Sequence, residues 1–195
     1  MYFKLFQILA DYLMIIIFFP IIIFLFLLIS FFQVFFYGKN IFYFQDRLGQ
    51  NKKKFKIIKF KTIILKNDVE ISNFFSKFLR RSSLDEIPQI FNILKREMSF
   101  VGPRPYPLNI DLYHNSLKNI NVDKRFETLP GITGLSQINY SGSERKLSEK
   151  ILLDIEYVNK LSIKLYCKIV FKTFIVLLIR YRINKSGKSL KSILK

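Results

Sequence analysis

The longest feature of the hydrophobic pattern is a run without any charged residue from Tyr12 to Tyr37, YLMIIIFFPIIIFLFLLISFFQVFFY. At about 1.5 Å per residue, a helix of this length can cross a hydrocarbon core of about 30 Å. A cleaved signal peptide fits poorly, because the run is too long and bulky Phe and Gln stand where small residues mark a cleavage site. The pattern therefore predicts a segment that stays in a lipid bilayer.

Pro20 interrupts this run and leaves two arrangements open. Proline removes a backbone donor and disfavours helical geometry at the preceding residue, so the segment is expected to kink or to turn back there. Lysine and arginine are more frequent after the run than before it, where Lys4 is offset by Asp11. This asymmetry puts the body of the protein on the cytoplasmic side. A re-entrant helix that returns to that side explains both flanks, and a plain spanning helix is the alternative.

The rest of the chain combines strand-like and helix-like patterns. Residues 51–62, NKKKFKIIKFKT, alternate lysine with apolar residues and change phase at Ile57 and Ile58. This predicts a strand with a bulge at that pair and with one lysine-rich face. Residues 70–81 and 84–96 are expected to form helices.

Near the C-terminus, lysines recur every four residues beside apolar positions, which predicts a basic amphipathic helix lying in a membrane interface. The four are Lys160, Lys164, Lys168 and Lys172. Together the patterns predict a mixed fold, mainly α with a small β element. We expect a membrane helix over residues 1–38, a cytosolic-face domain with interfacial helices over 39–183, and a basic tail over 184–195.

Charge and rare residues narrow the choice of partners. The 32 Lys and Arg residues outnumber the 14 Asp and Glu residues, for a net charge of +18. This charge predicts an anionic partner such as anionic lipid, nucleic acid or a phosphorylated substrate. Cys167 is the single cysteine, which excludes an intramolecular disulfide and a cysteine zinc cluster. Because His114 is the single histidine, neither a histidine metal site nor a Ser-His-Asp triad is expected.

Two of the scarce acids, Asp85 and Glu86, stand side by side in SSLDEIPQIFNILKREMSFVGPRP, residues 82–105. Ser83 and Glu86 fit a capping box, and acids favour the first turn of a helix, so the pair can simply begin a helix. The same helix end also favours a phosphate, because its backbone N–H groups and its dipole attract anions. The two interpretations are compatible with each other.

Chemistry on phosphorus would give each of these residues a use. An Asp carboxylate can attack phosphorus, and a neighbouring Glu can hold Mg²⁺, which prefers carboxylate and phosphate oxygens. Metal and arginine together reduce the repulsion between an anionic nucleophile and a diphosphate. Arg80 or Arg81, together with Arg104, can make bidentate phosphate contacts. Prolines on both sides of Arg104 restrict its backbone.

The stretch over 82–105 closely resembles the core motif of the bacterial sugar transferase family, the monotopic polyprenyl-phosphate phosphoglycosyltransferases. Shorter matches extend the resemblance over about residues 1–183: Lys4 with Asp11, Pro20 within the apolar run, QDRLG (45–49), KFKT (59–62), PGITG (130–134) and LDIEYV (153–158). The long motif is highly specific, and the short ones support it.

The resemblance implies a re-entrant membrane helix and a catalytic domain on the cytoplasmic face of the bacterial inner membrane. Members of the family transfer a sugar-1-phosphate from a UDP-sugar to undecaprenyl phosphate with Mg²⁺ and release UMP, as the first membrane step of surface glycan synthesis. By motif position, Asp85 would be the nucleophile that forms an aspartyl-phosphosugar intermediate, and Glu86 would bind Mg²⁺. The residues that would bind the substrates or their phosphates are Arg80, Arg104, Lys59, Lys61 and Thr133.

The sequence departs from the family pattern at two positions near the PGITG motif. Leu129 stands where an arginine usually precedes the Pro-Gly, and Leu135 stands where tryptophan is common. We expect these differences to alter nucleotide or sugar contacts and to leave the phosphoryl chemistry intact.

A second hypothesis belongs to another class: a non-catalytic basic membrane-surface protein that binds anionic lipid or a partner. It accounts for the charge, the apolar run and the lysine-rich helix, and it gives Asp85 and Glu86 only a capping role. Nucleic-acid binding is not expected, because the basic residues flank a membrane segment and no recognition motif stands out.

Overall fold

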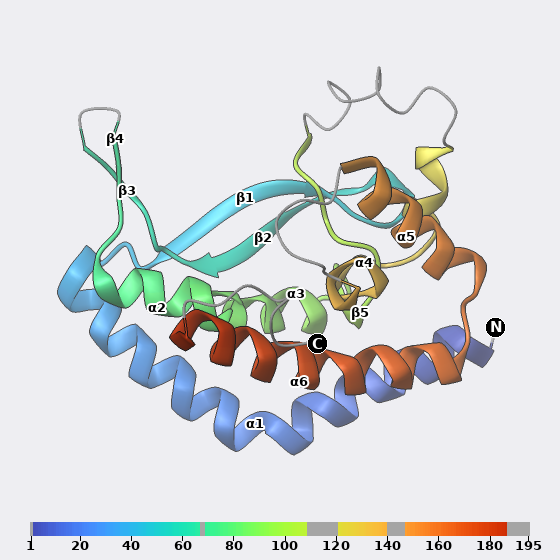
Figure 1. Cartoon of the computed structure of the whole chain (residues 1–195), viewed down its shortest axis with the longest axis horizontal. Helices are drawn as coiled ribbons and strands as arrows, with labels where there is room; N and C mark the ends of the chain where they lie inside the picture. The colour runs from blue at the N-terminus through green and yellow to red at the C-terminus, as the bar shows by residue number, and fades with distance from the viewer. Residues whose placement is uncertain (1, 67–68, 109–120, 140–146, 187–195) are drawn as a thin grey trace.

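The structure is a computed structural model that describes residues 2–66, 69–108, 121–139 and 147–186. His114 and residues 187–195 of the predicted tail lie outside these ranges. Two long helices, α1 (Tyr2–Tyr37) and α6 (Ile163–Ser186), run side by side along one side of the molecule, and a long hairpin lies on the other (Figure 1). The shorter helices are α2 (Phe74–Ser82), α3 (Ile90–Leu94), α4 (Leu135–Ile138) and α5 (Leu147–Asn159), with 3₁₀ turns η1 (Gln50–Lys52), η2 (Leu84–Gln89) and η4 (Val122–Glu127). The predicted class, mainly α with a small β element, is confirmed.

The strands of the described residues form three two-stranded sheets. Two of the pairs are antiparallel and the third is parallel. The pairs are β1 (Phe42–Leu48) with β2 (Lys54–Phe60), β3 (Ile64–Lys66) with β4 (Val69–Ile71), and, in parallel, β5 (Ser99–Val101) with β6 (Gly131–Thr133).

The bulge predicted at Ile57 and Ile58 is wrong. The β1–β2 pairing continues without a break over all seven residues of each strand. Both faces of β2 are covered, since Ile57 belongs to one buried cluster and Phe60 to another, so adjacent apolar residues need no change of phase. Because side chains alternate along an unbroken strand, Lys59 falls on the same face as Phe55 and Ile57 and is directed inward.

The helices predicted over 70–81 and 84–96 are each divided into two elements. The first segment starts as β4 and continues as α2, where Asn73 accepts a hydrogen bond from Ser76 N (2.7 Å) and caps the helix. The second segment consists of η2 and α3. It ends before Arg96, whose left-handed backbone (φ 58°) turns the chain towards β5.

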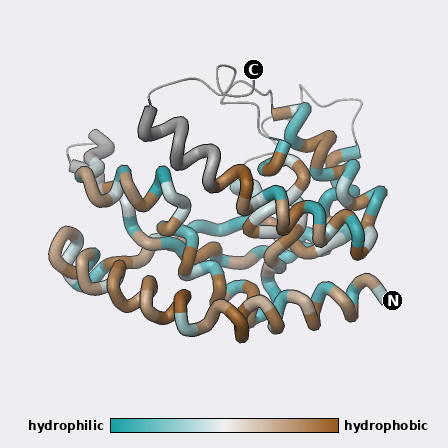
Figure 2. Tube along the Cα trace, turned by 60° about the horizontal axis from the view of Figure 1, so that its bottom comes forward, coloured by the Kyte–Doolittle hydropathy of each residue, from teal (hydrophilic) through white to brown (hydrophobic). Residues whose placement is uncertain are grey.

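α1 is a single helix of 36 residues that contains Pro20 and bends near its middle (Figure 1). Its residues are hydrophobic along most of its length (Figure 2). Within the described ranges it is the one helix long and apolar enough to cross a bilayer by length and composition, and only 11% of its most apolar window is buried. An apolar surface this large and this exposed is typical of contact with lipid or with a partner.

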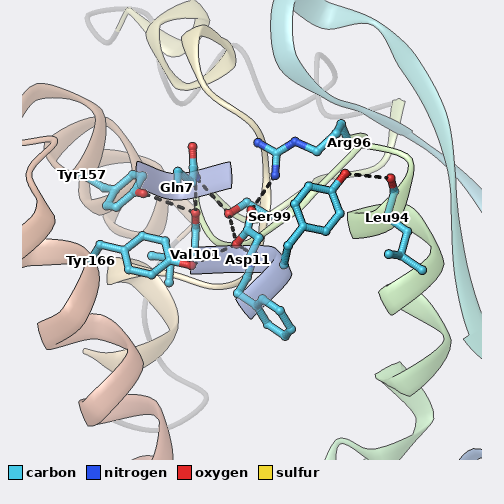
Figure 3. Close-up of polar contacts among 10 residues, drawn as sticks. Gln7, Asp11, Leu94, Arg96, Ser99, Val101, Tyr157 and Tyr166 are labelled. Carbon is cyan, nitrogen blue, oxygen red and sulfur yellow. Dashed lines mark hydrogen bonds and ion pairs between the residues drawn. The ribbon is translucent and has the colours of Figure 1, made fainter. Parts of the chain in front are cut away.

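The first arm of α1 is fixed to the body by a buried carboxylate. Asp11 pairs with Arg96 Nη1 (2.7 Å) and accepts hydrogen bonds from Ser99 Oγ (2.9 Å), Phe100 N (3.1 Å) and Tyr166 OH (2.9 Å) (Figure 3). Burial and the charge of Asp11 raise the pKa of Tyr166, so its hydroxyl stays a donor. One side chain thus ties α1 to the turn before β5, to β5 itself and to α6.

The second arm of α1 is tied to the same body. Gln33 is fully buried, and its Nε2 donates to Lys61 O (3.1 Å) just after β2. Tyr37 OH makes a hydrogen bond with Ser76 Oγ in the first turn of α2. Both ends of the bent helix are therefore attached to one globular body.

The lysine row predicted as one helix is divided over two elements. Lys160 follows the end of α5 and pairs with Glu156 (2.7 Å), whereas the other three lysines lie on α6. All four are exposed. α6 buries Tyr166 and Ile169 against the core and leaves Phe174 half exposed beside α1. Its position in a membrane interface stays a prediction.

Replacing Asp11 by alanine is expected to lower the free energy of unfolding by about 3–5 kcal/mol, because Arg96 and three other donors lose their buried acceptor. Denaturant titration in detergent micelles measures this loss. Lys160→Ala is the matched control, since its exposed ion pair with Glu156 is expected to contribute only about 0.5 kcal/mol or less. Equal losses in the two variants would contradict the role of Asp11.

Candidate active site

One cavity of about 510 Å³ gathers nearly all of the residues assigned from the sequence. Its charged and polar lining includes Lys59, Arg80, Asp85, Glu86, Arg104 and Thr133. Among the predicted substrate-binding residues, Lys61 is the exception within the described structure: it lies just past β2, and its backbone binds Ile41 and Gln33. The cavity therefore brings together five segments that are far apart in the sequence.

The acid pair begins a short 3₁₀ helix, η2, and the predicted capping box does not form. Ser83 ends α2 in a left-handed conformation (φ 59°), and its N–H donates to Leu79 O. A capping box requires an extended backbone at the cap residue and uses that N–H to bind the side chain of Glu86. Because both requirements fail, Glu86 takes another partner.

That partner is Lys59. Its Nζ lies 2.5 Å from Glu86 Oε1, and both side chains are about four-fifths buried, with exposures of 19% and 20%. Lys59 reaches the acid pair because the unbroken pleat of β2 directs it inward. The unbroken β1–β2 pairing that excludes the bulge also brings Lys59 to Glu86.

The surroundings of Asp85 weaken its acidity. Burial, reinforced by the charge of Glu86, raises the pKa of Asp85 to about 6, although Lys59, its own backbone amide and Arg80 act in the opposite direction. The carboxyl group is still mainly ionised at pH 7. A carboxylate perturbed in this way inside a cavity is typical of a group that takes part in chemistry.

Arg104 reaches the cavity because two loops pack backbone against backbone. A Cβ on Gly131 would lie 2.1 Å from Gly102 N, so a side chain there would separate β5 from β6. The amide of Gly131 donates to Pro103 O (2.9 Å). This glycine of the PGITG motif therefore allows the close packing of the two backbones.

A buried ion pair that the sequence analysis did not assign lies behind Arg104. Arg125 pairs with Asp154 (3.1 Å) and also donates to Arg104 O, while Ser136 Oγ donates to Asp154 Oδ1 (2.7 Å). Arg125 and Asp154 are almost completely buried. The pair fixes the backbone of Arg104. In the sequence, the LDIEYV motif that contains Asp154 was the signal that could have indicated this pair.

Arg47 is a further site residue that sequence reasoning missed. It lies on β1, donates to Pro105 O (3.0 Å), and lines a small adjoining cavity of about 20 Å³ with Glu86 and Arg104. Burial and the charge of Arg104 lower the pKa of Arg47. The QDRLG motif contained this arginine, but only the strand pairing and the fold bring it close to Arg104.

α6 contributes part of the cavity wall. Thr173, Val176 and Leu177 line the cavity, at a spacing that puts them on one face of the helix. Leu84 and Ile132 add apolar surface. The spacing of these three residues could have indicated a cavity-lining face from the sequence. The prediction instead concerned the exposed lysines of the same helix.

Neither departure from the family pattern lies in the main cavity. Leu129 is buried and lines a separate cavity of about 290 Å³ together with Gly49 and Phe55. Leu135 packs against the core cluster that contains Val101. The expectation that these two leucines alter substrate contacts is therefore not supported by their positions.

A metal ion would need ligands from a substrate. Within the described residues, no three His, Cys, Asp or Glu side chains gather as a metal site. The acids that line the main cavity are Asp85 and Glu86. Mg²⁺ often binds through one or two carboxylates and completes its coordination with water and substrate phosphates. The donor set thus fits Mg²⁺ in the presence of a diphosphate.

Residues 2–180 match the profile of the family described as bacterial sugar transferase. The UDP-glucose:undecaprenyl-phosphate glucose-1-phosphate transferase of Xanthomonas campestris pv. campestris is 36% identical over 149 residues, which cover 68% of this chain and 30% of that protein. The protein of the same name from Klebsiella pneumoniae is 38% identical over 144 residues, which cover 66% and 30%. The chain therefore corresponds to less than a third of these two relatives.

A shorter relative is matched over most of its length. The exopolysaccharide production protein ExoY of Rhizobium meliloti is 30% identical over 194 residues. The match covers 86% of this chain and 81% of that protein. The match to the family profile, over residues 2–180, includes both the apolar N-terminal helix and the residues that line the cavity.

Lys59 and Glu86 are expected to shift the pKa of Asp85 in opposite directions. Lys59→Met removes a cation that lowers this pKa, so the pKa should rise above about 6. Glu86→Gln removes an anion that raises it, so the pKa should fall below that value. Carboxyl ¹³C NMR titration of aspartate-labelled protein in detergent micelles measures both shifts, and shifts of the same sign would contradict the geometry.

Proposed function

Because this chain belongs to the bacterial sugar transferase family, we propose that it transfers a sugar-1-phosphate from a UDP-sugar to undecaprenyl phosphate and releases UMP. The observation that carries the proposal is that an acid pair, three cationic side chains and an apolar wall line one cavity. Relatives named for glucose-1-phosphate transfer to undecaprenyl phosphate and for exopolysaccharide production support it. In this role the protein begins the assembly of a surface glycan on a lipid carrier.

Asp85 is the nucleophile of the proposed reaction. One of its carboxylate oxygens forms a bond to the sugar-bearing phosphorus, the bond from this phosphorus to the bridging oxygen of the diphosphate breaks, and UMP leaves with the electron pair. A covalent intermediate divides one difficult displacement into two easier ones. The pKa of about 6 keeps Asp85 mainly ionised at neutral pH, as a nucleophile requires.

The lipid acceptor completes the reaction. An oxygen of undecaprenyl phosphate attacks the same phosphorus, the bond to Asp85 breaks, and the carboxylate is regenerated as the lipid-linked diphosphate sugar leaves. The cavity therefore needs cations that can hold phosphates in both steps. Arg80 and Arg104 are exposed residues of its lining and can make bidentate phosphate contacts.

Glu86 would hold Mg²⁺ together with the diphosphate of the donor. The bound ion supplies positive charge that offsets the charge of the diphosphate and of the leaving phosphate. The contact with Lys59 (2.5 Å) fixes the orientation of the Glu86 carboxylate. Lys59 also lowers the pKa of Asp85 and so favours the ionised form of that carboxyl group.

We also propose that α1 is re-entrant and that the body of the protein lies at the cytoplasmic face of the inner membrane. The two arms of α1 are attached to one body through Asp11 and Gln33. The helix bends near its middle (Figure 1), and Pro20 lies in the middle of its residue range. A straight spanning helix carries its ends to opposite faces of the bilayer, which is incompatible with both attachments. The excess of lysine and arginine after the apolar run supports a body on the cytoplasmic side.

Asp85→Asn is expected to slow UMP release by about a thousandfold or more, because the amide cannot serve as the nucleophile. The assay measures Mg²⁺-dependent UMP formation from a panel of UDP-sugars in the presence of undecaprenyl phosphate. Asp123→Asn is the matched control, since Asp123 is exposed and lies outside the cavity. UMP release by Asp85→Asn at the parent rate would overturn the nucleophile assignment.

Lipid binding by a parent protein that forms no UMP would favour the non-catalytic hypothesis.

The ends of α1 are expected to be accessible from the same side of the membrane. In a Cys167→Ser background, cysteines introduced as Lys4→Cys and Lys39→Cys should both react with a membrane-impermeant maleimide in inside-out vesicles, and neither should react in intact spheroplasts. Both positions are exposed at the two ends of the helix. Reaction of the two cysteines from opposite sides would establish the spanning alternative.

A further inference from the structure

We propose that the Thr133 hydroxyl accepts a hydrogen bond from a hydroxyl or N–H group of the sugar nucleotide. We further propose that Thr173 on α6 fixes Thr133 in this acceptor role by accepting its proton. The inference rests on the proposed function and deepens it. It gives Thr133 a role other than phosphate binding. Thr173 becomes a positioning residue.

Two consecutive hydrogen bonds connect Thr133 to the backbone of α6. Thr173 Oγ1 donates to Ile169 O, one turn earlier in α6, at 2.8 Å. Threonines on helices commonly use their hydroxyl proton in this way. Thr133 Oγ1 lies 2.7 Å from Thr173 Oγ1. A hydroxyl group has a single proton, so Thr173, whose proton is directed to Ile169, has to be the acceptor from Thr133.

Thr133 Oγ1 consequently presents lone pairs, and no proton, to the cavity. Both threonines line the same cavity as Asp85, Glu86 and Arg104. Ionised phosphates are themselves acceptors, so an acceptor oxygen does not stabilise them. A group that carries a proton is the proper partner of Thr133: a sugar or ribose hydroxyl, or the N–H of uracil.

This polarity distinguishes the two substrates. An ionised polyprenyl phosphate has no donor group to offer, whereas a UDP-sugar has several hydroxyls and one N–H. The position of Thr133 is also fixed by its backbone, because Thr133 O accepts a hydrogen bond from Gly102 N (2.9 Å). Thr133 is therefore expected to act in the binding of the donor substrate and to leave the binding of the lipid acceptor unaffected.

Three single variants and their controls test the inference. Thr133→Val should raise the KM for the UDP-sugar about two- to tenfold, the usual effect of losing one neutral hydrogen bond, and should leave the KM for undecaprenyl phosphate unchanged. Thr133→Ser, which keeps the hydroxyl, should retain the parent KM. Thr128→Val is the matched control in the same segment, because Thr128 Oγ1 is buried without a hydrogen-bond partner among the described residues and does not line the cavity.

Thr173→Val separates polarity from packing. The substitution preserves the shape of the side chain but removes the acceptor, so the Thr133 proton is released towards the cavity. A twofold to tenfold rise in the KM for the UDP-sugar is again expected. The double variant should show no further rise beyond Thr133→Val, because both changes remove the same interaction. If Thr173 only filled space, Thr173→Val would leave this KM unchanged.

UDP-sugars that lack single hydroxyl groups identify the recognised position. The parent should use one deoxy donor less efficiently than the complete donor, and Thr133→Val should use the two equally. A Thr133→Val protein with an unchanged KM for every UDP-sugar, or with a raised KM for undecaprenyl phosphate alone, would overturn the inference while UMP release by the parent upholds the proposed function.

The opposite failure is also distinguishable. If the parent forms no UMP from any UDP-sugar, the proposed transfer is refuted, and the acceptor role is tested by binding alone. Calorimetric titration of UDP-glucose into the parent and Thr133→Val proteins in nanodiscs should then show weaker binding by the variant. Equal affinities would overturn the inference.

Discussion

The structure depends on how one carboxylate is kept inside it. A buried carboxylate costs several kcal/mol unless charge and hydrogen bonds compensate for its lost hydration. Asp11 on α1 is fully buried, and its four partners come from segments that lie 85 to 155 residues further along the chain. The compensation is complete only when α1, β5 and α6 are assembled together (Figure 3). The apolar helix is thereby part of the fold and does not act as a separable anchor.

The same carboxylate supports two walls of the cavity. Ser99 begins β5, which leads directly to Arg104, and Tyr166 lies on α6, which carries Thr173 to the cavity. Because both residues bind Asp11, the position of the first arm of α1 and the shape of the cavity are connected through short elements. The proposed transfer from a water-soluble donor to a lipid acceptor requires a site at the membrane surface, and this shared support would provide that placement.

Sequence patterns were sufficient where the cause of a structure is local. The apolar run and the acid pair followed by Gly-Pro-Arg-Pro predicted the long apolar helix and most of the residues that line the cavity. They failed where contacts with residues distant in the sequence determine the local structure. The change of phase at Ile57 suggested a bulge because a strand with one solvent-exposed face would need one, but β2 packs apolar residues on both faces. The packing of β2 against α1 and α3 is a tertiary contact, and the alternation of residues along the strand does not predict it.

The acid pair shows how such a failure changes the chemistry. Local propensity assigned Ser83 and Glu86 to a capping box, whose two hydrogen bonds would have kept Glu86 turned back on its own helix. The Ser83 N–H donates to Leu79 O at the end of α2 and is not available to Glu86. The Glu86 carboxylate instead pairs with Lys59, 27 residues earlier in the chain. Helix capping and the ion pair with Lys59 are therefore alternative uses of one side chain. In this protein Lys59 on β2 holds Glu86 in the cavity, and the charge of Glu86 helps to raise the pKa of the neighbouring Asp85, the proposed nucleophile.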